Sequence, residues 1–125
     1  MPGEKRQYLI ADDNRALAEN LAEIMRDQGD EVSIANDGAD ALRLIRGKKF
    51  DALLTDMRMP LMGGAALIKA IQGADPGLPV VVMTAYIGES DLVDARHSGV
   101  LAVLPKPVPI PLMLSLVGGA RRDAR

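Results

Sequence analysis

The chain has 125 residues, of which 48% are hydrophobic and 26% charged, and its formal net charge is -2. This balance is typical of a folded protein with one hydrophobic core, and the charge argues against direct binding to nucleic acid or anionic membranes. The absence of cysteine excludes disulfides, thiolate metal sites and cysteine nucleophiles. No signal-peptide pattern or membrane-spanning apolar run is present, so we expect a cytoplasmic protein.

Short apolar runs alternate five times with segments of helical periodicity, a pattern typical of a parallel sheet covered by helices on both faces. Strands are predicted at residues 8–11, 32–35, 52–55, 79–84 and 100–104. Helices are predicted between residues 14 and 29, 38 and 47, 64 and 75, about 89 and 98, and 112 and 117. We therefore expect a single α/β domain over 1–125, with a core from about 7 to 118 and a tail or linker start at 119–125.

The last predicted helix and the segment before it have unusual compositions. Four prolines lie between residues 105 and 111, and they are expected to stiffen this segment and delay the helix. Pro105 is compatible with the fifth strand only if that strand lies at an edge of the sheet. Because the helix is apolar nearly all round, part of it should stay exposed, which suggests contact with an effector or a second copy.

Polar side chains follow four of the predicted strands. Asp12 and Asp13 follow the first, and the others are Asp56 after the third, Thr84 at the end of the fourth and Lys106 just beyond the fifth. In open parallel sheets a ligand site lies beyond the carboxyl ends of the strands, so we expect these groups to share one edge. Three converging carboxylates repel one another unless a divalent cation binds them, and oxygen ligands suit Mg²⁺.

The same groups match what phosphoryl transfer to a carboxylate requires. Asp56 would be the nucleophile, Lys106 and a metal would neutralise charge, and Thr84 would donate a hydrogen bond to a phosphoryl oxygen. The product, an acyl phosphate, is reactive and suits a temporary signal.

The motifs Asp12-Asp13, Asp56 to Pro60 with Gly64 following, Thr84-Ala85 and Lys106-Pro107 resemble those of the response-regulator receiver domains of two-component signalling, the CheY-like family. The resemblance covers nearly the whole chain. It implies a doubly wound five-stranded sheet in the order 2-1-3-4-5, the order known for CheY, with five helices. It also implies that Asp56 is the phosphoacceptor and that Thr84 and Lys106 stabilise the phosphoryl group.

The resemblance further implies a cofactor, partners and an output surface. Mg²⁺ or Mn²⁺ would be held by Asp12, Asp13, Asp56 and the backbone carbonyl of Arg58. The phosphoryl donor would be the phosphohistidine of a sensor histidine kinase or phosphotransfer protein. Output would pass through the fourth helix, fifth strand and last helix, and the domain would catalyse only its own phosphorylation and dephosphorylation. Lys106–Pro107 is the candidate for a cis peptide bond.

One position departs from this pattern, and two others are expected to tune the site. Similar domains carry an aromatic switch residue three positions before the lysine, where this chain has Val103. Either movement of Thr84 is read out in another way, or the two states differ less. Tyr86 is the only aromatic residue near the site and could partly substitute. Arg58 and Tyr86 occupy the positions that tune self-hydrolysis in similar domains.

The same residues also have simpler interpretations. Asp12-Asp13 alone is most simply a helix cap with a solvated acid, and Lys106 alone a surface charge. A receiver fold used only for protein contacts, with binding independent of phosphorylation, is the main alternative. A flavodoxin-like carrier would need a glycine- and hydroxyl-rich loop after the first strand. A haloacid-dehalogenase-type phosphatase would need a second aspartate where Arg58 stands.

Overall fold

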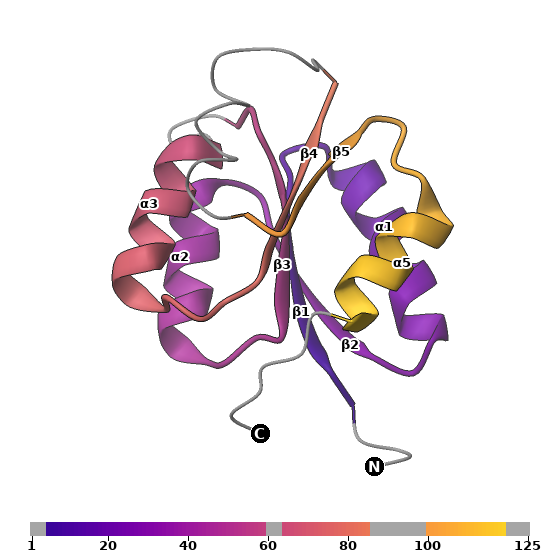
Figure 1. Ribbon diagram of the computed structural model, residues 1–125, viewed down its shortest axis with the longest axis horizontal. Helices are drawn as coiled ribbons and strands as arrows, with labels where there is room; N and C mark the ends of the chain where they lie inside the picture. Colours follow the sequence, from indigo (N-terminus) through magenta and orange to yellow (C-terminus); the bar gives the residue numbers. More distant parts are fainter. Residues whose placement is uncertain (1–4, 60–63, 86–99, 120–125) are drawn as a thin grey trace.

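A five-stranded parallel sheet forms the middle layer of the molecule (Figure 1). The computed structural model describes residues 5–59, 64–85 and 100–119. Neighbouring strands follow the order β2-β1-β3-β4-β5, and every pair is parallel, so the predicted topology is confirmed. The strands are β1 Gln7–Ala11, β2 Glu31–Ala35, β3 Ala52–Asp56, β4 Val80–Thr84 and β5 Ala102–Pro105.

Helices cover both faces of the sheet (Figure 1). Helices α2 and α3 lie on one face, and α1 and α5 lie on the other. Their bounds are α1 Arg15–Asp27, α2 Gly38–Gly47, α3 Gly64–Ala74 and α5 Ile110–Gly119. The helix predicted at about 89–98 falls outside the described residues, as do residues 120–125 of the predicted tail. Within the described ranges, none of the helices is both long and apolar enough to cross a membrane.

The alternation of side chains along the strands divides the core into two clusters. Successive strand residues point to opposite faces, so Leu53 packs towards α2 and α3, whereas Leu54 packs towards α1 and α5. Both side chains are almost fully buried. Burying one leucine side chain stabilises a fold by about 1.5–3 kcal/mol. Apolar packing on both faces therefore stabilises the central strands.

Polar side chains fix where the helices begin. The Asn14 side chain accepts a hydrogen bond from the amide of Leu17 at 3.1 Å, and Asp37 accepts one from the amide of Asp40 at 2.8 Å. These bonds satisfy amides that have no partner inside the helix. After α1, Gly29 has a φ of 95°, a left-handed conformation that glycine adopts without strain. The connections on either side of β2 and the start of α1 are therefore set locally.

The last helix begins earlier than its prolines suggested. It starts at Ile110 and contains Pro111 in its first turn, so the predicted delay to residue 112 was wrong. The first amides of a helix have no intrahelical acceptor, and proline therefore costs nothing at this position. Part of the helix is exposed as predicted, since half of the Leu112 surface is accessible, whereas Met113 and Val117 are buried.

Proline also fits at the end of β5. This strand is at the edge of the sheet, as the presence of Pro105 required. The next amide, that of Lys106, donates to the carbonyl of Thr84 on β4 at 2.9 Å. Alternate residues of a parallel strand bond the same neighbour, so the nitrogen of Pro105 faces away from β4. A proline there removes no hydrogen bond of the sheet.

Candidate functional site

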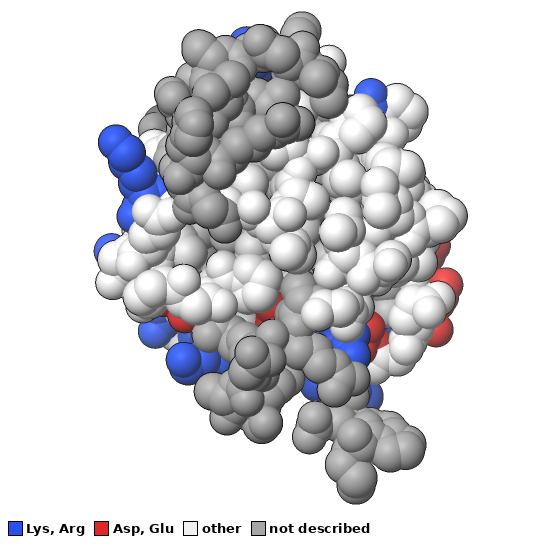
Figure 2. Space-filling model, in the orientation of Figure 1, with Lys and Arg blue, Asp and Glu red and all other residues white. Residues whose placement is uncertain are grey.

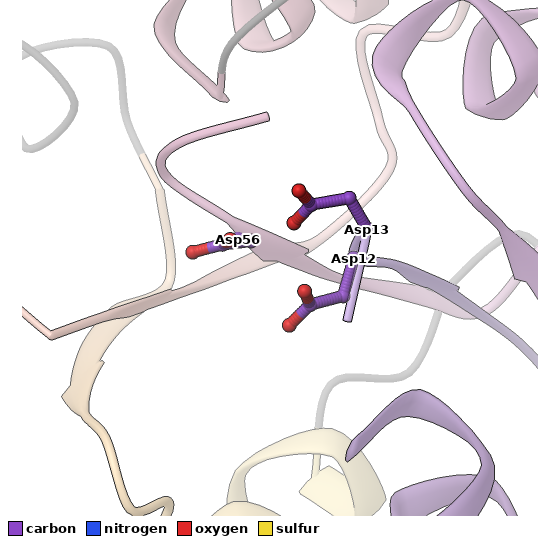
Figure 3. A group of neighbouring side chains, drawn as sticks. All are labelled: Asp12, Asp13 and Asp56. Carbon is purple, nitrogen blue, oxygen red and sulfur yellow. The ribbon is translucent and has the colours of Figure 1, made fainter. Parts of the chain in front are cut away.

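Three carboxylates converge at the carboxyl ends of β1 and β3 (Figure 3). Asp12 and Asp13 directly follow β1, and Asp56 is the last residue of β3. These strands are neighbours in the sheet, and the three side chains point to the same side of their ends. One oxygen of each carboxylate lies within 4.8 Å of the others. Asp12 is fully buried and Asp56 is 8% exposed, whereas Asp13 is open to solvent.

Lys106 brings a positive charge to this cluster. Its Nζ donates a hydrogen bond to Oδ2 of Asp12 at 3.0 Å and lies 3.3 Å from Oδ1 of Asp56. Lys106 lies just beyond the edge strand β5. Its long side chain therefore extends across the sheet to the carboxylates that follow β1 and end β3. Three carboxylates around one ammonium group leave an excess of negative charge when all are ionised.

The electrostatic environment shifts the pKa values of Asp56 and Lys106. Burial raises the pKa of Asp56 above its ordinary value, and the negative charge of Asp12 raises it further. The charge and hydrogen bond of Lys106, together with the backbone amide of Arg58, lower this pKa without cancelling the increase. Burial lowers the pKa of Lys106. Asp12 and Asp56 raise it more strongly, through their hydrogen bonds to the ammonium group and their negative charges, so the pKa lies above its ordinary value.

Asn14 holds Asp12 in place, a role that the sequence did not reveal. The backbone amide of Asn14 donates to Oδ1 of Asp12 at 2.9 Å, while the side chain of Asn14 caps α1. Asp12 therefore has one oxygen bonded to its own loop and the other bonded to Lys106. The sequence signal was an aspartate two residues before a capping asparagine, the pattern of an Asx turn.

The other predicted site residues lie at the same edge of the sheet. Thr84 ends β4 and is buried, one position beyond the residue that pairs with Asp56. Arg58 is exposed, and its amide bonds the Asp56 carboxylate. Val103 is partly buried and packs against the core cluster beneath α2 and α3. Tyr86 lies outside the described residues. The peptide bond between Lys106 and Pro107 is cis, as expected.

The donor set fits a hard divalent cation. Every candidate side-chain ligand is a carboxylate oxygen, and two of the three carboxylates come from nearly dry positions, Asp12 and Asp56. Mg²⁺ prefers oxygen ligands and commonly binds through one or more carboxylates together with water or phosphate oxygens. The excess of negative charge would attract such an ion. The exposure of Asp13 would let the ion reach the carboxylates from solvent.

Comparison with known proteins identifies the family of this chain. Residues 8–117 match the response regulator receiver domain family. A response regulator receiver protein of Anaeromyxobacter sp. (strain Fw109-5) is 60% identical over 111 residues, covering 89% of this chain and 47% of that protein. The transcriptional regulatory protein ZraR of Klebsiella oxytoca is 39% identical over 108 residues, covering 86% and 24%. The chain thus spans about half or a quarter of the length of these relatives.

Solved structures show the same fold. A CheY-like receiver domain protein from Methanospirillum hungatei JF-1 superposes with a TM-score of 0.87 at 27% identity, over 92% of each chain. The receiver domain of a sensor histidine kinase from Pseudomonas aeruginosa PAO1, solved with a magnesium ion in its active-site cleft, has a TM-score of 0.85. It is 22% identical and covers 94% of this chain and 98% of that one, a likeness that concerns the fold alone.

Proposed function

This chain belongs to the family of response regulator receiver domains, and from that premise we propose that Asp56 accepts a phosphoryl group in two-component signalling. The donor would be the phosphohistidine of a sensor histidine kinase or a phosphotransfer protein. The observation that carries the proposal is the cluster of Asp12, Asp13 and Asp56 within 4.8 Å, with the Lys106 ammonium between Asp12 and Asp56.

The transfer would exchange one bond for another. A carboxylate oxygen of Asp56 attacks phosphorus, the bond between phosphorus and the donor's imidazole nitrogen breaks, and an acyl phosphate forms. Lys106 stands within reach to stabilise the charge on the phosphoryl oxygens, and the Thr84 hydroxyl would donate a hydrogen bond to one of them. Burial of Asp56 keeps bulk water away from the nucleophile.

The proposed cofactor is Mg²⁺, or Mn²⁺ in its place. Asp12, Asp13 and Asp56 would hold it, together with the backbone carbonyl of Arg58. When bound, such a cation supplies positive charge that offsets the repulsion between the carboxylates and the incoming phosphoryl group. The same residues would hold the ion when water hydrolyses the acyl phosphate and regenerates the free Asp56. Arg58, exposed beside Asp56, would tune that hydrolysis.

Receiver domains are signalling domains, so the consequence of phosphorylation is a change at another surface. We place that surface at β5 and α5, together with the predicted fourth helix. Helix α5 contains no charged residue, and the described part of this face is largely free of charge (Figure 2). Exposed Leu101 and Leu112 offer apolar contacts to an effector or a second copy. The output of the whole protein and its cytoplasmic location stay predictions.

Phosphorylation can be tested by intact mass. Incubation with acetyl phosphate and Mg²⁺ should add one phosphoryl group to the wild-type chain, and a chelator should prevent the addition. Asp56→Asn should stay unlabelled because an amide oxygen is a poor nucleophile.

Asp51→Asn is the matched control. It makes the same chemical change at another buried aspartate, just before β3 begins, where the carboxylate accepts a bond from the Gln7 amide at 2.8 Å. This variant should be labelled like the wild type. Labelling of Asp56→Asn to the wild-type extent would refute Asp56 as the acceptor.

A receiver fold that binds partners independently of phosphorylation remains the second candidate. Val103 favours it, because a small, partly buried valine cannot swing in and out as an aromatic switch does. The two functions predict different changes in the amide NMR shifts of residues 102–105 and 110–119 when phosphodonor is added. Shifts throughout both segments support the switch, and shifts confined to the neighbours of Asp56 support the binding module.

A further inference from the structure

The last turn of α5 is capped by residues from the beginning of the chain. Nη1 of Arg6 donates a hydrogen bond to the carbonyl of Gly118 at 2.6 Å, and the hydroxyl of Tyr8 donates to the carbonyl of Val117 at 3.3 Å. The Arg6 guanidinium also donates to the Tyr8 hydroxyl at 3.4 Å. Arg6 and Gly118 are 112 positions apart, so this cap depends entirely on the tertiary fold.

Backbone carbonyls in the last turn of a helix need donors from outside the helix. The last turn of α5 contains no basic residue. A cation near the carboxyl end of a helix also interacts favourably with the helix dipole. Arg6 therefore supplies both a donor and a charge that the sequence of α5, which is wholly uncharged, does not provide.

The capping groups are themselves held from two sides. The backbone of Arg6 is bonded to the turn before β2, because its amide donates to Oδ1 of Asp30 at 3.3 Å and its carbonyl accepts from Glu31 at 2.9 Å. The ring of Tyr8 is buried in the core cluster that includes Val117. At Gly118, an added Cβ would lie 3.4 Å from Nη1 of Arg6, so the guanidinium fits closely over this residue.

We propose that Arg6 and Tyr8 act as a clasp that fixes the last turn of α5. The clasp lies by the amino ends of the strands, opposite the edge that carries Asp56 (Figure 1). It anchors one end of α5, while the other end follows the loop that contains Lys106. Motion that begins near Lys106 would then bend or tilt α5 about a held end. The capping role does not depend on phosphorylation.

Hydrogen–deuterium exchange can test the clasp. In Arg6→Gln, Tyr8→Phe and the double variant, the amides of residues 116–119 should exchange faster than in the wild type. We expect about tenfold for the double variant, because a hydrogen bond to a charged group changes a local opening equilibrium by that order. Arg6→Lys, which keeps the charge and a donor, should recover part of the protection.

Arg26→Gln is the matched control. Nη2 of Arg26 also donates to a backbone carbonyl, that of Val32 at 2.9 Å, but this bond joins α1 to β2 and not to α5. This variant should leave exchange at 116–119 unchanged. Unchanged exchange at 116–119 in the double variant would overturn the proposal, and so would an equal acceleration in β3, since that would mean a general loss of stability.

Discussion

At the scale of single residues, the chemical environment separates groups that look alike in the sequence. Asp12 and Asp13 are neighbours, yet Asp12 is fully buried and bonded to Lys106, whereas Asp13 is open to solvent. Asp56 is also buried, and burial raises its pKa. A partly desolvated carboxylate is more basic and more nucleophilic than a solvated one, and the charge of Lys106 favours its ionised form, which suits the proposed role of Asp56.

Tyr8 leads to a prediction about pH. Burial raises the pKa of Tyr8 above its ordinary value of 10.0, with Asp30 and Asp51 adding to the increase and Arg6 opposing it. A group whose pKa is raised in the folded state contributes stability that is complete below its unfolded pKa and is lost as pH rises through its folded pKa. Tyr8→Phe should be less stable than the wild type by about 1 kcal/mol at pH 7, because it lacks the hydroxyl that bonds Val117 and Arg6.

Above about pH 10 this difference should shrink, because only the wild type loses the contribution of a neutral Tyr8. Urea unfolding of both proteins between pH 7 and 11 measures the difference in their free energies of unfolding. Other titrating groups contribute equally to both proteins and cancel in this difference. A difference that stays constant over this range would contradict the prediction.

At the scale of elements, the starts of α1 and α2 follow from local chemistry, whereas the end of α5 does not. Asn14 and Asp37 cap α1 and α2, and Gly29 follows α1 in a left-handed conformation. Helix α5 starts before the predicted residue 112, because Pro111 lies in its first turn, where a proline breaks no hydrogen bond. The end of α5 depends on Arg6 and Tyr8, which no local pattern could predict.

The cap of α1 can be removed without touching the backbone bond to Asp12. Asn14→Ala should lower the free energy of unfolding by about 1 kcal/mol, because the Leu17 amide loses its acceptor. Asn14→Ser, which keeps an acceptor, should recover most of this loss. Chemical unfolding at neutral pH gives both values.

Asn36→Ala is the control for this measurement. Asn36 accepts a bond from Arg15 at an exposed position and caps no helix, so its replacement should change stability by less than about 0.5 kcal/mol. Equal losses for Asn14→Ala and Asn36→Ala would argue against the capping role.

At the scale of the whole molecule, the sheet separates two cores. One core lies under α2 and α3 and the other under α1 and α5, and alternate residues of the same strand belong to different cores. The carboxyl ends of β1, β3 and β4 and the residue after β5 meet at one edge, which brings the site together. Residues near the amino ends of the strands hold α5 instead.

The separation of the cores predicts nearly independent mutations. Ile10→Val and Ile71→Val each remove one buried methylene group from opposite faces of the sheet, and each should cost about 0.5–1.5 kcal/mol. The double variant should equal the sum within about 0.5 kcal/mol, because the two side chains share no cluster. Ile68→Val with Ile71→Val, within one cluster, should show larger coupling. Strong coupling between Ile10 and Ile71 would mean that strain passes through the sheet.

The sequence by itself determined the alternating pattern of strands and helices and the set of polar residues at one edge, because these depend on short-range periodicity and on the direction of parallel strands. It also indicated the family through motifs that keep their order. Only the tertiary structure decided that Asp12 is buried while Asp13 is exposed, that Lys106 contacts Asp12 as well as Asp56, and that Arg6 caps a helix 112 positions away. Such contacts depend on how distant segments are placed across the sheet, and that placement is set by the packing of both cores together.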